Sequence, residues 1–284
     1  MSAASHAVRL GLKRGWIEFS QSLKASQDIG FNIFMAGGVL LYLFFNRNET
    51  IEGSDLLLPA LVVPGILGGL VAFSLILGPA FQIAIEREDG TLLRAKAIPH
   101  GMVGYVIGQV VLHTLGILPL FVIILLPSLF LFDGATPGDF AGWLTLVAVL
   151  AVGVLATMPW GLMLGSVARG PRGVSTWGML PVIGLLVISG VFYPITAMAG
   201  WLQVIAQIFP VYWLGLGMRS AFLPDEAAAI EIGESWRTLE TFGVLGVWAV
   251  IGLALAPIVL RRMARRESGS AVEARRQQAL QRVG

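Results

Sequence analysis

The sequence predicts an all-α integral membrane protein with six transmembrane helices, an N-terminal amphipathic interfacial helix and a re-entrant helical hairpin between the fifth and sixth spans. Apolar residues make up 56% of the 284 residues and charged residues only 13%, whereas soluble globular proteins contain about 25% charged residues. The apolar residues are gathered in long runs of the length that crosses a bilayer, about 20 residues each. Composition and run length together therefore predict a multi-pass membrane protein.

Residues 1–28 are predicted to form the interfacial helix. Large apolar side chains recur there at spacings of three and four residues, the repeat of one helix face: Val8, Leu12, Trp16, Phe19 and Leu23. A helix of this kind lies in the inner membrane interface with its cations toward anionic lipid. It serves either as a simple membrane-lying leader or as a platform for a cytoplasmic partner.

Residues 29–260 are predicted to form the transmembrane domain. The six expected spans are residues 29–45, 56–85, 102–132, 143–168, 177–193 and 241–260. Between the last two, residues 195–222 are apolar but interrupted by Gly200, Pro210, Gly215 and Gly217. Irregular backbone is tolerated at membrane depth only where protein covers it, so we expect a re-entrant hairpin. The alternative is a seventh crossing.

The distribution of cations predicts the orientation. Of the 19 lysines and arginines, all except Arg47, Arg219 and Arg237 fall in segments on one side of the six-span arrangement. Cytoplasmic loops hold the excess of Lys and Arg, so both termini are expected to be cytoplasmic. Residues 261–284 form an Arg-rich cytoplasmic tail that is expected to be attracted to anionic lipid. A seventh crossing would place this tail outside.

Catalytic motifs are missing from the sequence. The three lysines, Lys13, Lys24 and Lys96, do not end a Walker loop, whose glycines and lysine hold phosphate. His6, His100 and His113 are scattered, and the chain has no cysteine, so we expect no metal site. We therefore predict that the chain is not an enzyme and has no catalytic, cofactor-binding or metal-binding residue. We also expect no nucleic-acid partner.

Few polar residues fall within the predicted spans. His113 is the one ionisable candidate, and a neutral imidazole hydrogen-bonded to a neighbouring helix is favoured over a proton-coupling role. Gln82 and Gln109 are likewise expected to bond between helices. Ion-driven transport is therefore weakly supported.

Residues 86–99 interrupt the apolar pattern on the side that carries the cations. Their expected functional residues are Glu86, Arg87, Glu88, Asp89, Gly90, Thr91 and Pro99. Gly90 predicts a turn, the Thr91 hydroxyl is expected to cap a helix over residues 91–97, and Pro99 ends it. The four charged residues offer contacts to a cytoplasmic partner. The alternative is a solvated connector.

This segment resembles the E-x-x-x-G-T-[LM]-x-x-x-x-x-x-P segment in the first cytoplasmic loop of ABC-2 type transporter permeases, with departures at Leu93 and Ile98. A second stretch is similar to that family's S-G-x-x-x-P … W-L … P … R pattern across span five and the hairpin. Its matching residues are Ser189, Gly190, Pro194, Trp201, Pro210 and Arg219. Two motifs in order within a six-span chain make the resemblance specific, and it covers nearly the whole chain.

The resemblance implies the transmembrane subunit of an ABC exporter of the drug- and antibiotic-exporter-like branch, with a type V exporter-like fold in a bacterial plasma membrane. Residues 86–99 would be its coupling helix, pushed by an ABC ATPase present in two copies. ATP and Mg²⁺ would be bound by that partner, and a second permease, identical or homologous, would complete the transporter. Membrane lipid is the remaining partner.

The expected substrate is an amphipathic drug, antibiotic or lipid-like molecule moved out of the cytoplasm or inner leaflet. One alternative within the class is a permease for polysaccharide or glycolipid export. From another class, the chain could be a gated channel or a membrane binding protein without an ATPase. Binding of an ATPase to residues 86–99 would discriminate between these functions.

Overall fold

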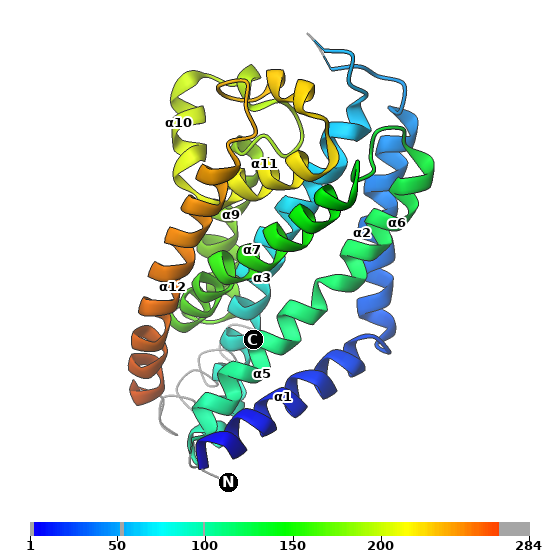
Figure 1. Ribbon diagram of the computed structural model, residues 1–284. Coiled ribbons are helices and arrows are strands. Elements are labelled where there is room, and N and C mark those ends of the chain that lie inside the picture. Colours follow the sequence, from blue (N-terminus) through cyan, green and yellow to red (C-terminus); the bar gives the residue numbers. More distant parts are fainter. Residues whose placement is uncertain (1–2, 52–53, 99, 267–284) are drawn as a thin grey trace.

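The computed structural model describes residues 3–51, 54–98 and 100–266, and this part of the chain is built almost entirely of helices (Figure 1). Its longer helices are α1 Ala3–Ser22, α2 Ser26–Phe45, α3 Leu58–Glu88, α5 Gly101–Gly116, α6 Leu118–Leu131, α7 Phe140–Val167, α9 Met179–Ile188, α10 Gly200–Ile208, α11 Pro210–Phe222 and α12 Thr238–Arg266. Shorter elements are α4 Thr91–Lys96, α8 Pro171–Gly173, the π-helix η1 Val174–Gly178 and the 3₁₀ helices η2 Ile195–Ala197 and η3 Asp225–Ile230. The prediction of an all-α membrane fold is confirmed.

Six candidate spans are found within the described residues. They are α2, α3, the α5–α6 pair, α7, the Pro171–Ile188 segment and α12, in the order that the sequence predicts. The third span is divided at Ile117, two residues before Pro119, because proline has no N–H to continue the helical ladder. The fifth span ends at Ile188 rather than at residue 193, since Gly190 turns the chain with φ +65°.

Helix α3 forms the centre of the bundle. It is mostly buried, with α7 and α11 packed along it, whereas α2 is mostly exposed and contacts chiefly α6. Close packing depends on glycine: a Cβ added to Gly161 of α7 would lie 2.5 Å from the carbonyl oxygens of Leu75 and Ile76 on α3. Small residues let membrane helices approach at this distance.

The segment between spans five and six is bent, as predicted. Helices α10 and α11 meet at 91° around Phe209 and Pro210, and both lie at the same end of the molecule (Figure 1). Helix α11 is buried along most of its length, which supplies the covering that irregular backbone needs at membrane depth. This geometry fits a re-entrant hairpin.

Helix α1 packs on α5 through a face that the predicted apolar stripe does not include. Its buried residues are Ala7, Gly11, Gly15 and Phe19, at spacings of four residues. Of the predicted stripe, only Phe19 is buried; Val8, Leu12, Trp16 and Leu23 are exposed and available to lipid. The interfacial helix therefore has one small-residue face for protein and one large apolar face.

The ends of the described chain lie together. Helix α1 begins, and α12 ends at Arg266, at the end of the bundle opposite α10 and α11 (Figure 1). The first span starts at Ser26, three residues before the predicted boundary, and α12 extends six residues into the predicted tail. The rest of the tail, residues 267–284, lies outside the described residues.

Candidate functional site

The polar segment after α3 forms a tight turn followed by the short helix α4. Gly90 occupies the left-handed region at φ +80°, and a Cβ there would be strained. The Asp89 carboxylate accepts a hydrogen bond of 2.8 Å from the Thr91 N–H. The helix is confirmed within one residue, but the prediction that the Thr91 hydroxyl caps it is wrong, because Asp89 supplies the acceptor. Pro99 lies outside the described residues.

Glu86 is buried, with 4% of its surface exposed. Its Oε1 accepts hydrogen bonds of 2.9 Å from the Arg14 guanidinium on α1 and from Gln82 one turn earlier. Arg14 also donates to Glu18 at 2.6 Å. Burial opposes the charge of Arg14, but the two carboxylates outweigh it and raise the pKa of the guanidinium. Glu86 therefore joins α3 to the interfacial helix.

Arg87 caps the C-terminal end of α7. Its guanidinium donates to the carbonyl oxygens of Gly165, Ser166 and Ala168 at 2.9–3.0 Å. The last carbonyls of a helix lack partners in their own helix, and a cation there also complements the helix dipole. Glu88 lies against the loop after α7, where its Oε1 is 2.5 Å from the position of a Cβ on Gly170.

Leu92 anchors α4 in the bundle. Its side chain is 1% exposed and belongs to a cluster that draws on four spans: Ile83 of α3, Tyr105 of α5, Leu162 and Met163 of α7, and Ala256, Leu260 and Met263 of α12. Because protein interiors are closely packed and transmit strain, a displacement of α4 would be felt by all four spans.

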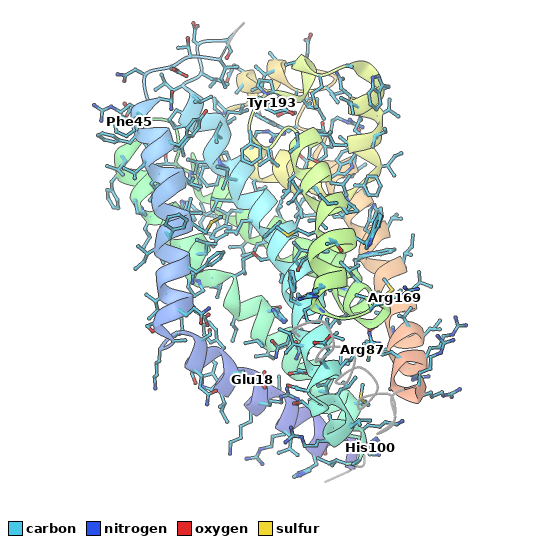
Figure 2. All side chains as sticks on the ribbon, turned by 180° about the vertical axis from the view of Figure 1, so that it is seen from behind. Glu18, Phe45, Arg87, His100, Arg169 and Tyr193 are labelled. Carbon is cyan, nitrogen blue, oxygen red and sulfur yellow. The ribbon has the colours of Figure 1, made fainter. Side chains whose placement is uncertain are left out.

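The outer surface of this region is basic and partly apolar. Arg94, Lys96, Ile98 and His100 are exposed. Between α1 and the α4–α5 segment lies a groove of about 550 Å³, here called the interface groove, whose lining includes Leu10, Arg94, Ile98 and Tyr105. Glu18, Arg87 and His100 all lie at this end of the molecule, and Phe45 and Tyr193 at the other (Figure 2). The groove is the accessible part of the site.

The second sequence motif lies at the opposite end. The Arg219 guanidinium, fully buried on α11, donates to Glu231 at 2.5 Å and to the Gly190 carbonyl oxygen at 2.9 Å. The Ser189 hydroxyl donates to the Leu185 carbonyl. Arg219 and Gly190 are thus brought together, and Glu231 supplies the counter-charge that a buried arginine requires.

The other members of this motif have separate positions. Pro194 precedes η2, Pro210 begins α11 and is buried, and Trp201 on α10 is 65% exposed. Proline suits the first position of a helix, where its missing N–H would have no partner. These residues shape the hairpin, while Arg219 joins it to the end of span five.

A second cavity, here called the inner cavity, lies nearer the middle of the bundle. It has a volume of about 650 Å³ and is lined from α1, α2, α3, α5, α9 and the residues that join them. His113 and Gln82 are on its wall. The His113 imidazole bonds Gln109 of its own helix at 3.0 Å, and Gln82 bonds Glu86 of α3. The predicted bonds to neighbouring helices are therefore wrong for these three side chains.

The fold and site define a multi-pass helical membrane protein with a short helix that contacts α3 and α5 and joins an apolar cluster drawn from four spans. The family model of ABC-2 type transporters matches residues 6–223, which include most of α1, the α4 segment and the whole hairpin. The chain belongs to the ABC-2 type transporter family. A search of curated proteins finds no match. Membership makes the chain a membrane transport component rather than a catalyst, and implies association with an ABC ATPase.

Several residues of the site were missed by the sequence reasoning. The sequence alone does not single out Arg14, Glu18, Leu92 or Glu231. One signal was available: an arginine in an apolar hairpin needs a nearby carboxylate, which pointed to an acid such as Glu231. For Arg14 no local signal existed, because its partner Glu86 is 72 residues away.

Proposed function

We propose that this chain is the permease subunit of an ATP-driven exporter in a bacterial plasma membrane, with both termini cytoplasmic. Two copies of it, or one copy with a homologous permease, work with two separate ATPase subunits that bind ATP and Mg²⁺. The observation that carries the proposal is the placement of α4, a short helix with a basic outer surface and an inner side chain, Leu92, packed among four spans.

The contacts of α4 support a coupling role. Helix α4 contacts α3 and α5, Leu92 belongs to an apolar cluster that extends to α7 and α12, and Arg14 and Glu86 link the adjoining end of α3 to α1. The Gly90 turn sets the angle between α3 and α4. When nucleotide binding draws the ATPase subunits together, a push on α4 tilts these helices as one unit. ATP binding thereby shifts the permease between two states.

The interface groove is the proposed docking surface for the ATPase. Its apolar residues Leu10 and Ile98 fit an apolar side chain of the partner, and Arg94 on its wall fits a carboxylate. Glu86 and Arg87 support this surface through contacts within the chain. We propose that Asp89 and Glu88, at the turn, add charged contacts at its edge.

The proposed substrate is an amphipathic drug, antibiotic or lipid-like molecule taken from the cytoplasm or inner leaflet and moved outward. The inner cavity supports this: its volume of about 650 Å³ falls in the range of small-molecule sites, about 300–1,000 Å³. Its wall mixes Phe73, Phe81 and Leu77 with polar groups, which matches a molecule with apolar and polar parts.

The first experiment is purification of the tagged chain from its native membranes in mild detergent, with subunit stoichiometry and ATPase activity measured on the eluate. We expect a P-loop ATPase in a one-to-one ratio. Arg94→Glu reverses the exposed charge of the groove and should remove most of the ATPase, with chain yield unchanged.

Arg47→Glu is the matched control, because Arg47 lies after α2 at the other end of the molecule. This variant should retain the ATPase. A chain that elutes alone and without ATPase activity would contradict the proposal and favour a channel. Equal ATPase recovery in both variants would contradict the docking surface while leaving the exporter intact.

A further inference from the structure

The charge of the inner cavity points to its ligand, an inference that rests on the proposed transport function. Two of its lining residues are acids, Glu18 of α1 and Asp28 in the first turn of α2, and none of the described lining residues is a lysine or arginine. Asp28 is exposed and the Glu18 side chain is partly exposed, so both carboxylates face the cavity region and attract cations there. The cavity therefore has a negative wall.

Arg14 does not neutralise the acidic wall of the inner cavity. Arg14 supplies one positive charge between two carboxylates, Glu18 and Glu86, so this cluster carries one net negative charge. Glu18 Oε1 bonds Arg14, whereas its Oε2 is buried without a hydrogen-bond partner among the described residues. This oxygen is shielded from solvent, so Glu18 contributes negative charge to the wall rather than a direct contact to a ligand.

Asp28 adds a second, independent acceptor. It forms no ion pair or hydrogen bond within the described part of the chain, and it lines the same cavity. Aromatic rings complete the wall, since Phe73 and Phe81 of α3 both face this space. Cations are attracted to the faces of aromatic rings as well as to carboxylates.

We propose that the inner cavity binds amphipathic organic cations. Asp28, which is exposed, contacts the positive group, Glu18 adds a second negative charge to the wall, and Phe73 and Phe81 contact the apolar part. The cavity is open toward the α1–α2 junction, where Ser22 and Ala25 also line it, so a cation concentrated at the anionic inner leaflet can reach it. The carboxylates thus select the charge of the substrate, and the cavity selects its size.

The test compares tetraphenylphosphonium with tetraphenylborate, which match in size and apolar surface but differ in the sign of charge. Binding of each ion to the purified permease in lipid nanodiscs is measured by equilibrium dialysis without nucleotide, and binding to empty nanodiscs is subtracted because the interfacial dipole potential draws the anion into lipid. We expect saturable binding of tetraphenylphosphonium that is at least about tenfold tighter than that of tetraphenylborate, through attraction of the cation to the carboxylates and aromatic rings, since neither ion carries a hydrogen-bond donor.

Three variants assign the site. Asp28→Asn removes one charge at a position without internal bonds, and Glu18→Gln keeps an amide oxygen for Arg14; each should weaken tetraphenylphosphonium binding by about five- to tenfold. Gly116→Phe fills the cavity, since a Cβ there meets nothing within 4 Å, and should abolish binding. Asp225→Asn, an exposed acid outside the cavity, should bind as wild type.

The outcomes separate the two proposals. Tighter binding of tetraphenylborate, or tetraphenylphosphonium binding unaltered by both Asp28→Asn and Gly116→Phe, would overturn the cation site even where an ATPase copurifies. Charge-selective binding that depends on these residues would support the site even if no ATPase is recovered. In that case the exporter proposal fails and the binding site stands.

Discussion

Arg14 joins three parts of the molecule through one guanidinium group. It donates to Glu18 on its own helix and to Glu86 at the end of α3, and it lies 5.2 Å from the centre of the Tyr105 ring on α5. Removing one partner of a buried pair leaves an uncompensated charge, which is more costly than the pair is stabilising. Glu86 is the group that would be left behind.

We expect Arg14→Ala to destabilise the protein by about 2 kcal/mol, less than for a fully buried pair because Arg14 remains partly exposed. The measurement is the midpoint of thermal unfolding of the purified protein in detergent. Arg9→Ala is the control, since Arg9 is exposed on the same helix. An equal shift in both variants would show that the ion pair contributes nothing.

Arg219 is fully buried, unlike the partly exposed Arg14. Its two bonds leave from different nitrogens, Nε to Glu231 and Nη1 to the Gly190 carbonyl. A guanidinium can serve two acceptors in fixed directions, and an ammonium group on a flexible stem cannot reproduce this geometry. The residue therefore requires arginine rather than merely a positive charge.

Arg219→Lys is accordingly expected to lower stability by about 3 kcal/mol, through a poorly paired Glu231. Unfolding in mixed micelles of increasing denaturing detergent measures this change. Arg47→Lys, at an exposed loop position, should unfold as wild type. Wild-type stability of Arg219→Lys would mean that Gly190 and Glu231 find other donors.

Helix α1 is attached to α5 by paired glycines. A Cβ on Gly11 would lie 2.5 Å from the Gly104 carbonyl oxygen, and one on Gly15 would lie 2.6 Å from that of Gly108. Both partners are backbone atoms, which cannot move aside as a side chain can. The interfacial helix is thus part of the bundle, and not only a membrane-lying leader.

The substitution Gly11→Leu should separate α1 from α5, at a cost of about 1–3 kcal/mol for overpacking. The expected readout is faster tryptic cleavage at Lys13 and Lys24 in detergent. Gly30→Leu provides the control on α2, because a Cβ there meets nothing within 4 Å. Unchanged cleavage in Gly11→Leu would argue against a fixed α1–α5 pair.

Helix α4 is short and depends on a single buried side chain for its position. Leu92→Ala should cost about 2–4 kcal/mol through the cavity it leaves, and should loosen α4 from α3 and α5 and from the apolar cluster that they share with α7 and α12. We expect ATPase to remain bound while transport into inverted vesicles falls several-fold. Leu93→Ala changes a half-buried neighbour and is the control, which should transport nearly as well as the wild type. An equal loss of transport in the two variants would contradict a special role of Leu92.

The whole bundle has an even number of crossings if α10 and α11 form a re-entrant pair. Six spans and a hairpin place α4 and the end of α12 on one side, and Arg47 and η3 on the other. A crossing hairpin would move α12 and everything after it to the opposite orientation. This is the difference between six and seven spans.

The chain has no cysteine, so single-cysteine labelling can test this arrangement directly. Arg94→Cys and Arg265→Cys should react with a membrane-impermeant maleimide in inverted vesicles, and Arg47→Cys and Asp225→Cys in right-side-out vesicles. Labelling of Arg265→Cys and Asp225→Cys in exchanged orientations would establish seven crossings. All four positions are exposed.

Local features of the chain were predictable from the sequence. The six spans follow from hydropathy, the position of α4 from the Gly90 turn and the hairpin from Pro210 and its glycines, and the two motifs pointed to the family. These features depend on transfer of apolar residues from water and on backbone preferences of proline and glycine. Both forces act within a few residues of the chain.

The partners of the polar side chains and the two cavities were decided only by the packing of the helices. Arg14 meets Glu86 across 72 positions and Arg87 meets the end of α7 across nearly 80, and neither pairing leaves a trace in periodicity. A helix pattern indicates which face is apolar but not which neighbour covers it. Glu86 and Arg87 are therefore satisfied within the chain, Glu86 by a counter-charge and Arg87 by backbone carbonyls, because buried charged groups require hydrogen-bond partners.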